Sequence, residues 1–175
     1  MASRDLVQTI CTVLCKTLTP SQAEEILAAT RPRSVPAGST VFREGEEGSG
    51  LLLLLKGSVE VVKQGPNGLS QQLATVDAPS VLGEMSLVSE RRHSATVRAT
   101  TDCEFRVLGR EEFLHLLERD NLAAHKLLGA IAEVLARRLR RMNDIAMELL
   151  GRSDTPAPVE ELTRFKEKLF SEWSF

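Results

Sequence analysis

The sequence has few cysteines, and their arrangement excludes two common kinds of site. Cys11, Cys15 and Cys103 are odd in number and form no Cys-x-x-Cys or Cys/His ligand spacing. They therefore predict neither a disulfide scaffold nor a zinc site. Cys11 and Cys15 lie four residues apart, on one face of a predicted helix. We interpret them as small buried side chains rather than as a redox or acylation site.

Long apolar runs and an excess of one charge are also missing. The longest apolar block, residues 51–55, is far too short to cross a bilayer, and no apolar run near the N-terminus ends in small residues. We therefore expect a cytoplasmic protein without a membrane partner. The 22 Lys and Arg are balanced by 24 Asp and Glu, which leaves a net charge of −2. This balance predicts no general attraction to nucleic acid.

Helical spacing marks the first 30 residues. Apolar residues recur every three or four positions over residues 5–18, which predicts an amphipathic helix. Thr19 followed by Pro20 is typical of an N-cap and a first helical position, so we expect a second helix from Pro20 to about Thr30. At 175 residues the chain is long enough for one packed domain with such helices added.

From Arg31 onward, glycine and proline separate short apolar or alternating segments, which is typical of many short strands joined by turns. Residues 65–68, Gly-Pro-Asn-Gly, predict a hairpin turn. Residues 51–55 are five leucines between glycines, which favours a strand buried on both faces. We predict a mainly β fold with flanking helices, an eight-stranded jelly-roll (double-stranded β-helix) barrel. Its strands are expected near residues 33–36, 40–43, 50–56, 58–64, 69–76, 80–82, 94–100 and 103–109.

Helical spacing returns at Arg110, where acidic residues in the first turn predict a short helix, and a long helix follows over about residues 122–150. Its apolar residues alternate steps of three and four, as in a helix paired with another; packing on its own barrel is the alternative. Because about eight turns exceed what so small a barrel covers, we predict a homodimer through this helix. The apolar stripe consists of Leu128, Ile131, Leu135, Leu139, Met142, Ile145 or Ala146, and Leu149.

Composition changes again after the long helix. The tail holds the only tryptophan, Trp173, and three of the six phenylalanines. Such clustering predicts docking, either on the barrel or on a protein partner. The predicted parts are N-terminal helices (1–30), the barrel (31–119), the long helix (120–150), a linker (151–158) and an amphipathic aromatic tail (159–175).

Three sequence blocks follow one another at regular separations. They are PAGSTVFREGE at residues 36–46, LLKGSVEV at 54–61, and GEMSL at 83–87 followed by SATVRA at 94–99. In this order they resemble the cyclic-nucleotide-binding domain family, which includes the catabolite activator protein and the regulatory subunits of cyclic-AMP-dependent protein kinase. The resemblance implies a sensor that binds cyclic AMP or cyclic GMP, needs no other cofactor, and signals to a protein partner through the long helix.

The last block resembles the phosphate-binding cassette of that family. The resemblance implies that Glu84 accepts a hydrogen bond from the ribose 2′-hydroxyl. It also implies that neighbouring backbone amides of a short helix approach the sugar phosphate. The family places an arginine on the phosphate, just before the small pair that begins the next strand. The ligand-binding residues implied in this chain are Gly83, Glu84, Met85, Ser86, Arg92, His93, Ser94 and Ala95.

His93 stands at the family's arginine position, and Arg92 precedes it. Strand alternation places His93 with Ala95 and Val97 on the apolar, inward face and Arg92 on the outward face. A neutral imidazole offers one donor and no forked geometry. Losing the charge-assisted pair costs about 1.5–3 kcal/mol, roughly ten- to a hundred-fold in affinity.

Three interpretations of the basic cluster stay open. Arg92 swings inward to meet the nucleotide, or His93 meets the phosphate and binding is weak and pH-dependent. In the third, His93 caps a pocket that no longer binds nucleotide, Arg91 and Arg92 form a solvated face, and the protein is an interaction adaptor. A nucleotide sensor needs the Glu84 carboxylate and a nearby cation to face each other across a gap the size of a sugar phosphate.

Other chemistry has little support in the sequence. His115 and His125 fall on predicted helices outside the barrel, so the histidines form no metal cluster, and no nucleophile elbow or P-loop is present. We therefore expect no enzyme. We interpret the four arginines within residues 137–141 as the solvated sides of a helix. Because only 25 residues follow Leu150, too few for a helix-turn-helix domain, we expect no DNA partner.

Overall fold

The computed structural model describes residues 3–65, 69–89 and 92–151. Within these ranges the strands are β1 (Arg31–Val35), β2 (Thr40–Phe42), β3 (Leu51–Lys56), β4 (Ser58–Gln64), β5 (Ser70–Asp77), β6 (Ser80–Leu82), β7 (Thr96–Ala99) and β8 (Cys103–Leu108). The helices are α1 (Ser3–Thr9), a π-helical turn η1 (Ile10–Leu14), α2 (Pro20–Ala28), α3 (Met85–Val88), α4 (Arg110–Glu118) and α5 (Leu122–Gly151). The predicted tail, the linker beyond Gly151, Arg91 and residues 66–68 of the predicted turn lie outside the described residues.

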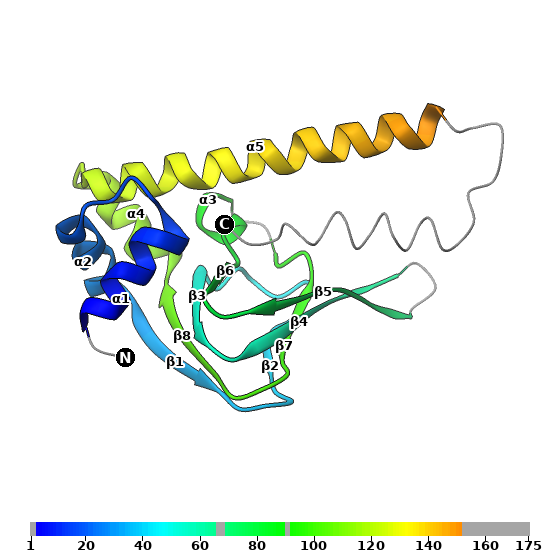
Figure 1. Cartoon of the computed structure of the whole chain (residues 1–175), viewed down its shortest axis with the longest axis horizontal. Helices are drawn as coiled ribbons and strands as arrows, with labels where there is room; N and C mark the ends of the chain where they lie inside the picture. The colour runs from blue at the N-terminus through cyan, green and yellow to red at the C-terminus, as the bar shows by residue number, and fades with distance from the viewer. Residues whose placement is uncertain (1–2, 66–68, 90–91, 152–175) are drawn as a thin grey trace.

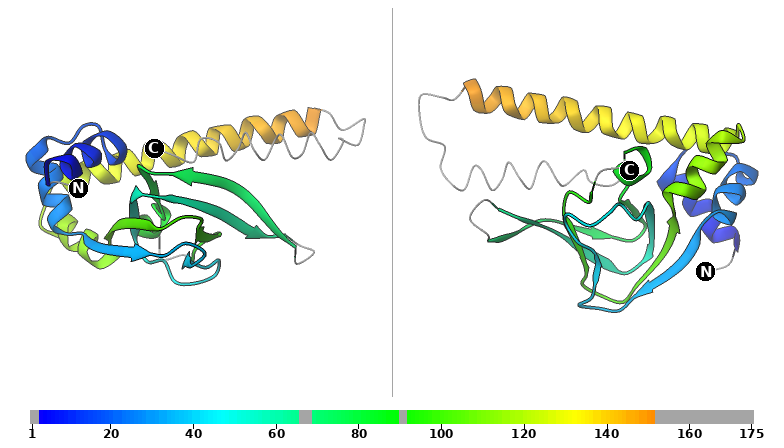
Figure 2. Two further views of the ribbon diagram at one scale, coloured as in Figure 1. Left: turned by 60° about the horizontal axis from the view of Figure 1, so that its bottom comes forward. Right: turned by 180° about the vertical axis from the view of Figure 1, so that it is seen from behind.

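The strands form two four-stranded antiparallel sheets, in the orders β1-β8-β3-β6 and β2-β7-β4-β5. Strands distant in sequence pair with one another, β1 with β8 and β2 with β7, as a jelly roll requires. Figures 1 and 2 show the two sheets curving around a shared interior. The predicted jelly roll with flanking helices is confirmed, as two sheets rather than one closed ring. We call the strands β1 to β8 the β roll.

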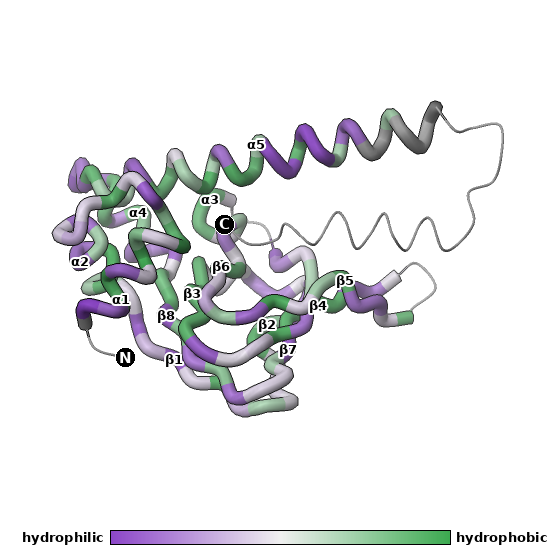
Figure 3. Tube along the Cα trace, viewed as in Figure 1, coloured by the Kyte–Doolittle hydropathy of each residue, from purple (hydrophilic) through white to green (hydrophobic). Residues whose placement is uncertain are grey.

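The leucine strand β3 joins two hydrophobic cores, because side chains alternate along a strand. Leu52 and Leu54 point into the β roll, where they pack with Phe105. Leu51 and Leu53 point the other way, into a core shared with the helices. β3 is accordingly coloured as hydrophobic along most of its length in Figure 3. The prediction of a strand buried on both faces is confirmed.

A layer of helices covers the outer face of the sheet that contains β3 and β8 (Figure 1). Its core is made by side chains such as Ile10, Ile26 and Phe113, all almost fully buried. The first predicted helix, residues 5–18, is instead α1 continued by η1, and it ends at Leu14. α2 begins as predicted, because the Thr19 hydroxyl accepts from the Gln22 N–H and the Gln22 side chain accepts from the Thr19 N–H.

The long helix α5 begins in the helical layer and then runs past α3 and beyond the β roll (Figure 1). The buried side chains of this helix end at Val134, and Leu135 still packs against the core shared with the other helices. The predicted stripe is therefore divided: Leu128, Ile131 and Leu135 pack on this core, while Leu139 and Met142 are 60% and 56% exposed. The first half of the helix therefore packs on its own domain, and this domain leaves the apolar residues of the second half uncovered. The buried stripe consists of Ala123, Ala124, Leu127, Ile131 and Val134.

Candidate functional site

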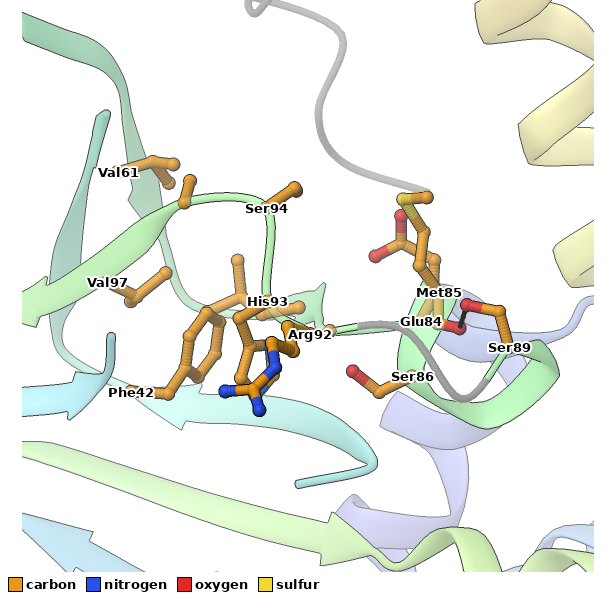
Figure 4. A pocket seen from close by; sticks show the side chains of 13 residues that line it. Phe42, Val61, Glu84, Met85, Ser86, Ser89, Arg92, His93, Ser94 and Val97 are labelled. Atoms are coloured by element: carbon orange, nitrogen blue, oxygen red, sulfur yellow. Dashed lines mark hydrogen bonds between the residues drawn. The ribbon is translucent and has the colours of Figure 1, made fainter. Parts of the chain in front are cut away.

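One pocket brings together all eight ligand-binding residues suggested by the sequence. It opens between α3 and the strand β7. Figure 4 shows its residues in two groups that lie on opposite sides. We call Gly83–Ser86 the Glu84 wall, and Phe42 with Arg92–Ala95 the His93 wall. The other lining residues are Val61, Leu82, Ser89 and Val97.

The Glu84 wall begins with a glycine that the backbone requires. Gly83 has φ +72°, a conformation that other residues adopt only with strain. A Cβ at this position would lie 2.6 Å from the carbonyl oxygen of Gly50, so only glycine fits against that neighbouring segment. The Ser86 N–H donates to the Gly83 carbonyl over 2.9 Å, which starts the short helix α3. The chain therefore turns sharply enough to place Glu84 at the base of the helix.

Glu84 is an almost fully buried carboxylate, 2% exposed, and its partner comes from α5. The Arg138 guanidinium donates to Glu84 Oε1. Arg138 follows Val134 by four residues, so it continues the buried stripe of α5 toward the pocket. The interpretation of all four arginines in 137–141 as solvated is therefore wrong for Arg138, although Arg137 and Arg140 are exposed. The spacing of four residues between Val134 and Arg138 was the sequence signal that could have placed Arg138 on the packed face of the helix.

The far end of α3 is also held by an arginine. Arg110, the first residue of α4, donates from Nη1 to the Leu87 carbonyl over 2.6 Å. Leu87 itself is buried in the core between the helices and the β roll. Both ends of the short pocket helix are thus attached to the helical layer. The sequence showed Arg110 only as a helix start.

The His93 wall follows the predicted alternation. His93, Ala95 and Val97 are buried and Arg92 is exposed. The His93 ring stacks on Phe42, with centroids 3.8 Å apart and planes at 12°. Figure 4 shows these two rings side by side, with Arg92 in front of them. Phe42 belongs to one of the quoted blocks, but its role as the surface under His93 depends on the pairing of β2 with β7.

Hydrogen bonds fix the protonation of His93. The Ser49 backbone N–H donates to His93 Nε2 over 3.1 Å, and Ser49 Oγ lies 3.2 Å from the same atom. Because a backbone N–H can only donate, Nε2 has a free lone pair and the ring is neutral. Burial lowers the pKa of His93 below its ordinary value of 6.5, and the Glu46 carboxylate partly opposes that effect.

Arg92 lines the mouth of the pocket but is already bonded. Its Nη1 donates to the Gly45 carbonyl over 2.7 Å. Glu84 is paired with Arg138, and His93 accepts from Ser49. The expected carboxylate and cation therefore line one pocket, but each has a partner other than the opposite wall.

In the part of the chain that the structure describes, no group of three or more His, Cys, Asp or Glu side chains is arranged to hold a metal ion. His115 and His125 lie on α4 and α5, away from the pocket residues. None of the described helices has the length and hydropathy needed to span a membrane.

Comparison with known proteins agrees with this geometry. Residues 32–120, about half of the chain, match the family model for the cyclic nucleotide-binding domain. The chain belongs to this family. Among curated relatives, the cyclic AMP receptor protein of Thermus thermophilus is 35% identical over 134 residues, which are 77% of this chain and 60% of that protein. A solved cyclic nucleotide-binding domain from Methylobacillus flagellatus is 25% identical, with a TM-score of 0.71 over 88% of this chain and 84% of that one.

The comparison corrects the expectation that DNA is not a partner. A relative from Mycobacterium tuberculosis, 29% identical over 145 residues, is named a CRP-like cAMP-activated global transcriptional regulator. It matches over 80% of this chain and 60% of its own length, so the chain spans about 60% of the length of each of these two relatives. DNA was excluded because only 25 residues follow Leu150. Longer transcriptional regulators share this domain, so the number of residues after Leu150 is not evidence against DNA as a partner. The exclusion is wrong.

Proposed function

We propose that this cyclic nucleotide-binding domain is a sensor whose pocket binds cyclic AMP or cyclic GMP. The observation that supports the proposal most directly is the convergence of all eight cassette residues on one pocket. The family match and the cyclic AMP receptor protein relative support the same ligand class. In this proposal the domain binds the nucleotide as a regulatory signal and catalyses no reaction.

Each wall has a distinct proposed role. Glu84 accepts from the ribose 2′-hydroxyl, and the backbone of Gly83, Met85 and Ser86 approaches the sugar phosphate closely. The phosphate then lies toward Arg92 and His93, with the small residues Ser94 and Ala95 leaving room for it. Phe42 and Val97 provide the apolar surface on the same side.

The Glu84–Arg138 pair is the proposed connection between ligand and α5. A ribose hydroxyl at Glu84 competes with Arg138 for the same carboxylate oxygens, so occupancy changes the free energy of the contact between α3 and α5. A ligand shifts a conformational equilibrium only by its differential affinity for the two states, and this contact supplies such a difference. We expect binding to change the position of α5 relative to the β roll.

The apolar residues that α5 leaves uncovered suggest how the signal leaves the domain. Leu139, Met142 and Met147 are each more than half exposed on the second half of this helix. A second copy of α5 is the occupant we propose for them, because Leu135, Leu139 and Met142 are separated by steps of four and three, as in a paired helix. Sedimentation or light scattering of the Leu139→Glu, Met142→Glu variant tests this, since two charges in the seam would leave monomers where the unmodified chain forms dimers.

Isothermal titration calorimetry with cyclic AMP and cyclic GMP tests the ligand. We expect Glu84→Gln to weaken binding by about ten- to a hundred-fold, because a charge-assisted hydrogen bond is lost. Glu60→Gln is the matched control, since Glu60 pairs with Arg98 on the outside of the β roll, and its affinity should equal that of the unmodified chain. Absence of binding at millimolar nucleotide, in both the unmodified chain and the His93→Arg variant, contradicts the proposal.

An adaptor that has lost its nucleotide is the second candidate. The observation in its favour is that His93, at the arginine position, already uses Nε2 to hold Ser49. Nucleotide binding that appears in His93→Arg and is missing in the unmodified chain would support this candidate. The apolar stripe of α5 would then serve protein contacts alone.

A further inference from the structure

The pocket contains a neutral ring where an anionic ligand needs positive charge. His93 is 6% exposed and stacked on Phe42 of β2, and Val61 of β4 and Val97 of β7 present only apolar side chains to the pocket. Among the described residues that line the pocket, those on β2, β4 and β7 include no ionisable side chain. A charge on His93 would therefore be sheltered from water and would act strongly on a nearby anion.

The charged groups around His93 already have partners. On the loop before β3, Glu46 pairs with Arg43 over 3.3 Å, and it is the carboxylate that acts on the ring. Arg92, next in the chain, donates to the Gly45 carbonyl. On the opposite wall, Glu84 is paired with Arg138. Arg92 keeps its charge while one of its N–H groups is engaged by Gly45, and among these groups the His93 ring is the one that can change its charge near neutral pH.

We infer that an anionic ligand enters this pocket together with one proton, which His93 takes up on Nε2 as it gives up the hydrogen bond from Ser49. The inference rests on the proposed function and deepens it, because it makes His93 the residue that determines how affinity depends on pH. The proton comes from the solvent, and no covalent bond other than N–H forms. An opposite charge within a few ångströms favours the charged imidazolium, so ligand and proton promote each other's binding.

Protonation also alters the loop that borders the pocket. His93 holds this loop through two backbone bonds, Gly45 N–H to the His93 carbonyl and His93 N–H to the Glu46 carbonyl, both 2.9 Å. Neither depends on the charge of the ring. The bond from the Ser49 N–H does, because a protonated Nε2 can no longer accept. Ser49 Oγ, 3.2 Å from Nε2, can accept from the protonated ring, so protonation releases the Ser49 backbone N–H while the side-chain contact can persist.

The freed segment touches the opposite wall. Gly50 follows Ser49, and its carbonyl oxygen lies so close to Gly83 that no Cβ fits between them. A shift at Ser49 and Gly50 therefore reaches Gly83 and, next to it, Glu84. His93 and Glu84 are thus connected through backbone packing as well as through a shared ligand. Protonation of His93 can therefore affect the contact between Glu84 and Arg138 through the backbone.

Calorimetry with cyclic AMP in two buffers of different ionisation enthalpy counts the protons taken up on binding. We expect uptake approaching one proton near pH 7, and affinity that falls by up to about tenfold per pH unit as the pH rises from 6 to 8. The His93→Arg variant should bind without proton uptake and with little pH dependence. His93→Gln keeps an acceptor for Ser49 but cannot gain a proton, so it should bind weakly at every pH.

A measurement without ligand tests the Ser49 step separately. In NMR titrations, the Ser49 amide resonance should move with the protonation of the His93 ring, while the Gly38 amide, bonded to the Ala99 carbonyl, should not follow it. A Ser49 amide that ignores the ring's titration overturns the inference.

The ligand measurements separate two failures. Binding of cyclic AMP by the unmodified chain without proton uptake overturns this inference and leaves the proposed function standing. Absence of binding in both the unmodified chain and His93→Arg overturns the two together. Binding in His93→Arg alone overturns the inference and favours the adaptor.

Discussion

The Glu84 wall and the His93 wall face the same pocket, but their polar groups find partners in different ways. Glu84 is ionised and depends on Arg138, which lies 54 residues away on α5. His93 is neutral and depends on Ser49 in the loop that it borders, and on the aromatic face of Phe42. The Glu84 wall pairs its buried carboxylate with an arginine that is distant in the sequence, whereas the His93 wall carries a neutral imidazole.

This difference shows which wall can respond to which signal. A buried carboxylate paired with a helix responds to anything that competes for its oxygens, so the Glu84 wall reports on ligand through α5. A buried neutral histidine responds to protons and to anions, because both change the stability of its charged form.

Arg138→Met should have the largest effect. It leaves the buried Glu84 carboxylate without its cation, and breaking a buried ion pair from one side costs about 3 kcal/mol of unfolding free energy. Urea denaturation measures this loss. Arg137→Met, on the exposed side of the same turn, should change the unfolding free energy by about 0.5 kcal/mol or less.

The double variant Glu84→Gln, Arg138→Met sharpens the first test. Removing the charge together with its partner should restore part of the lost stability, because no unpaired carboxylate stays buried. Losses that simply add would show that the two side chains do not act as a pair.

Gly83→Ala should have the second largest effect, about 2 kcal/mol. Both the positive φ and the Gly50 carbonyl oppose a side chain there. Gly38→Ala is the matched control: its φ is +78° and nothing lies within 4 Å of an added Cβ, so only the backbone cost of about 1 kcal/mol applies. Equal losses in thermal or urea unfolding would mean that the contact between Gly50 and Gly83 is unimportant.

His93→Gln should have the smallest effect at neutral pH and a clear one on the pH profile. The folded state lowers the pKa of His93, so between that lowered value and 6.5 the unfolded chain binds more protons. Unfolding free energy should therefore fall as the pH falls through this window, by at most about 1.4 kcal/mol per pH unit. Urea unfolding at pH 7.5 and 5.5 should show a smaller pH difference in the variant. If the variant kept the same difference in unfolding free energy between the two pH values, a group other than His93 would be responsible for it.

Much of the architecture could be predicted because it depends on local patterns. The glycine-bounded leucines of β3 and the Thr19-Pro20 cap of α2 specify a strand and a helix start from neighbouring residues alone. The inward direction of His93 followed from strand alternation. The eight pocket residues came from a family resemblance, and the fold brings them together.

Contacts between distant segments could not be predicted in the same way. Arg138 looked like its solvated neighbours, because the direction it takes from α5 depends on how that helix packs on α3. The partner of His93 depended on the loop before β3, whose path the sequence does not specify. The expectation about DNA failed for another reason, since a residue count describes one segment and not the regulators that share this domain.

The sequence by itself determined the order and kind of the elements, the two-faced burial of β3 and the identity of the side chain at the arginine position, because these depend on spacing and residue type. The tertiary structure alone decided that Glu84 pairs with Arg138 and that His93 is held neutral by Ser49. The physical reason is that ionisation and pairing depend on burial and on distances between side chains far apart in the chain, and only folding sets these.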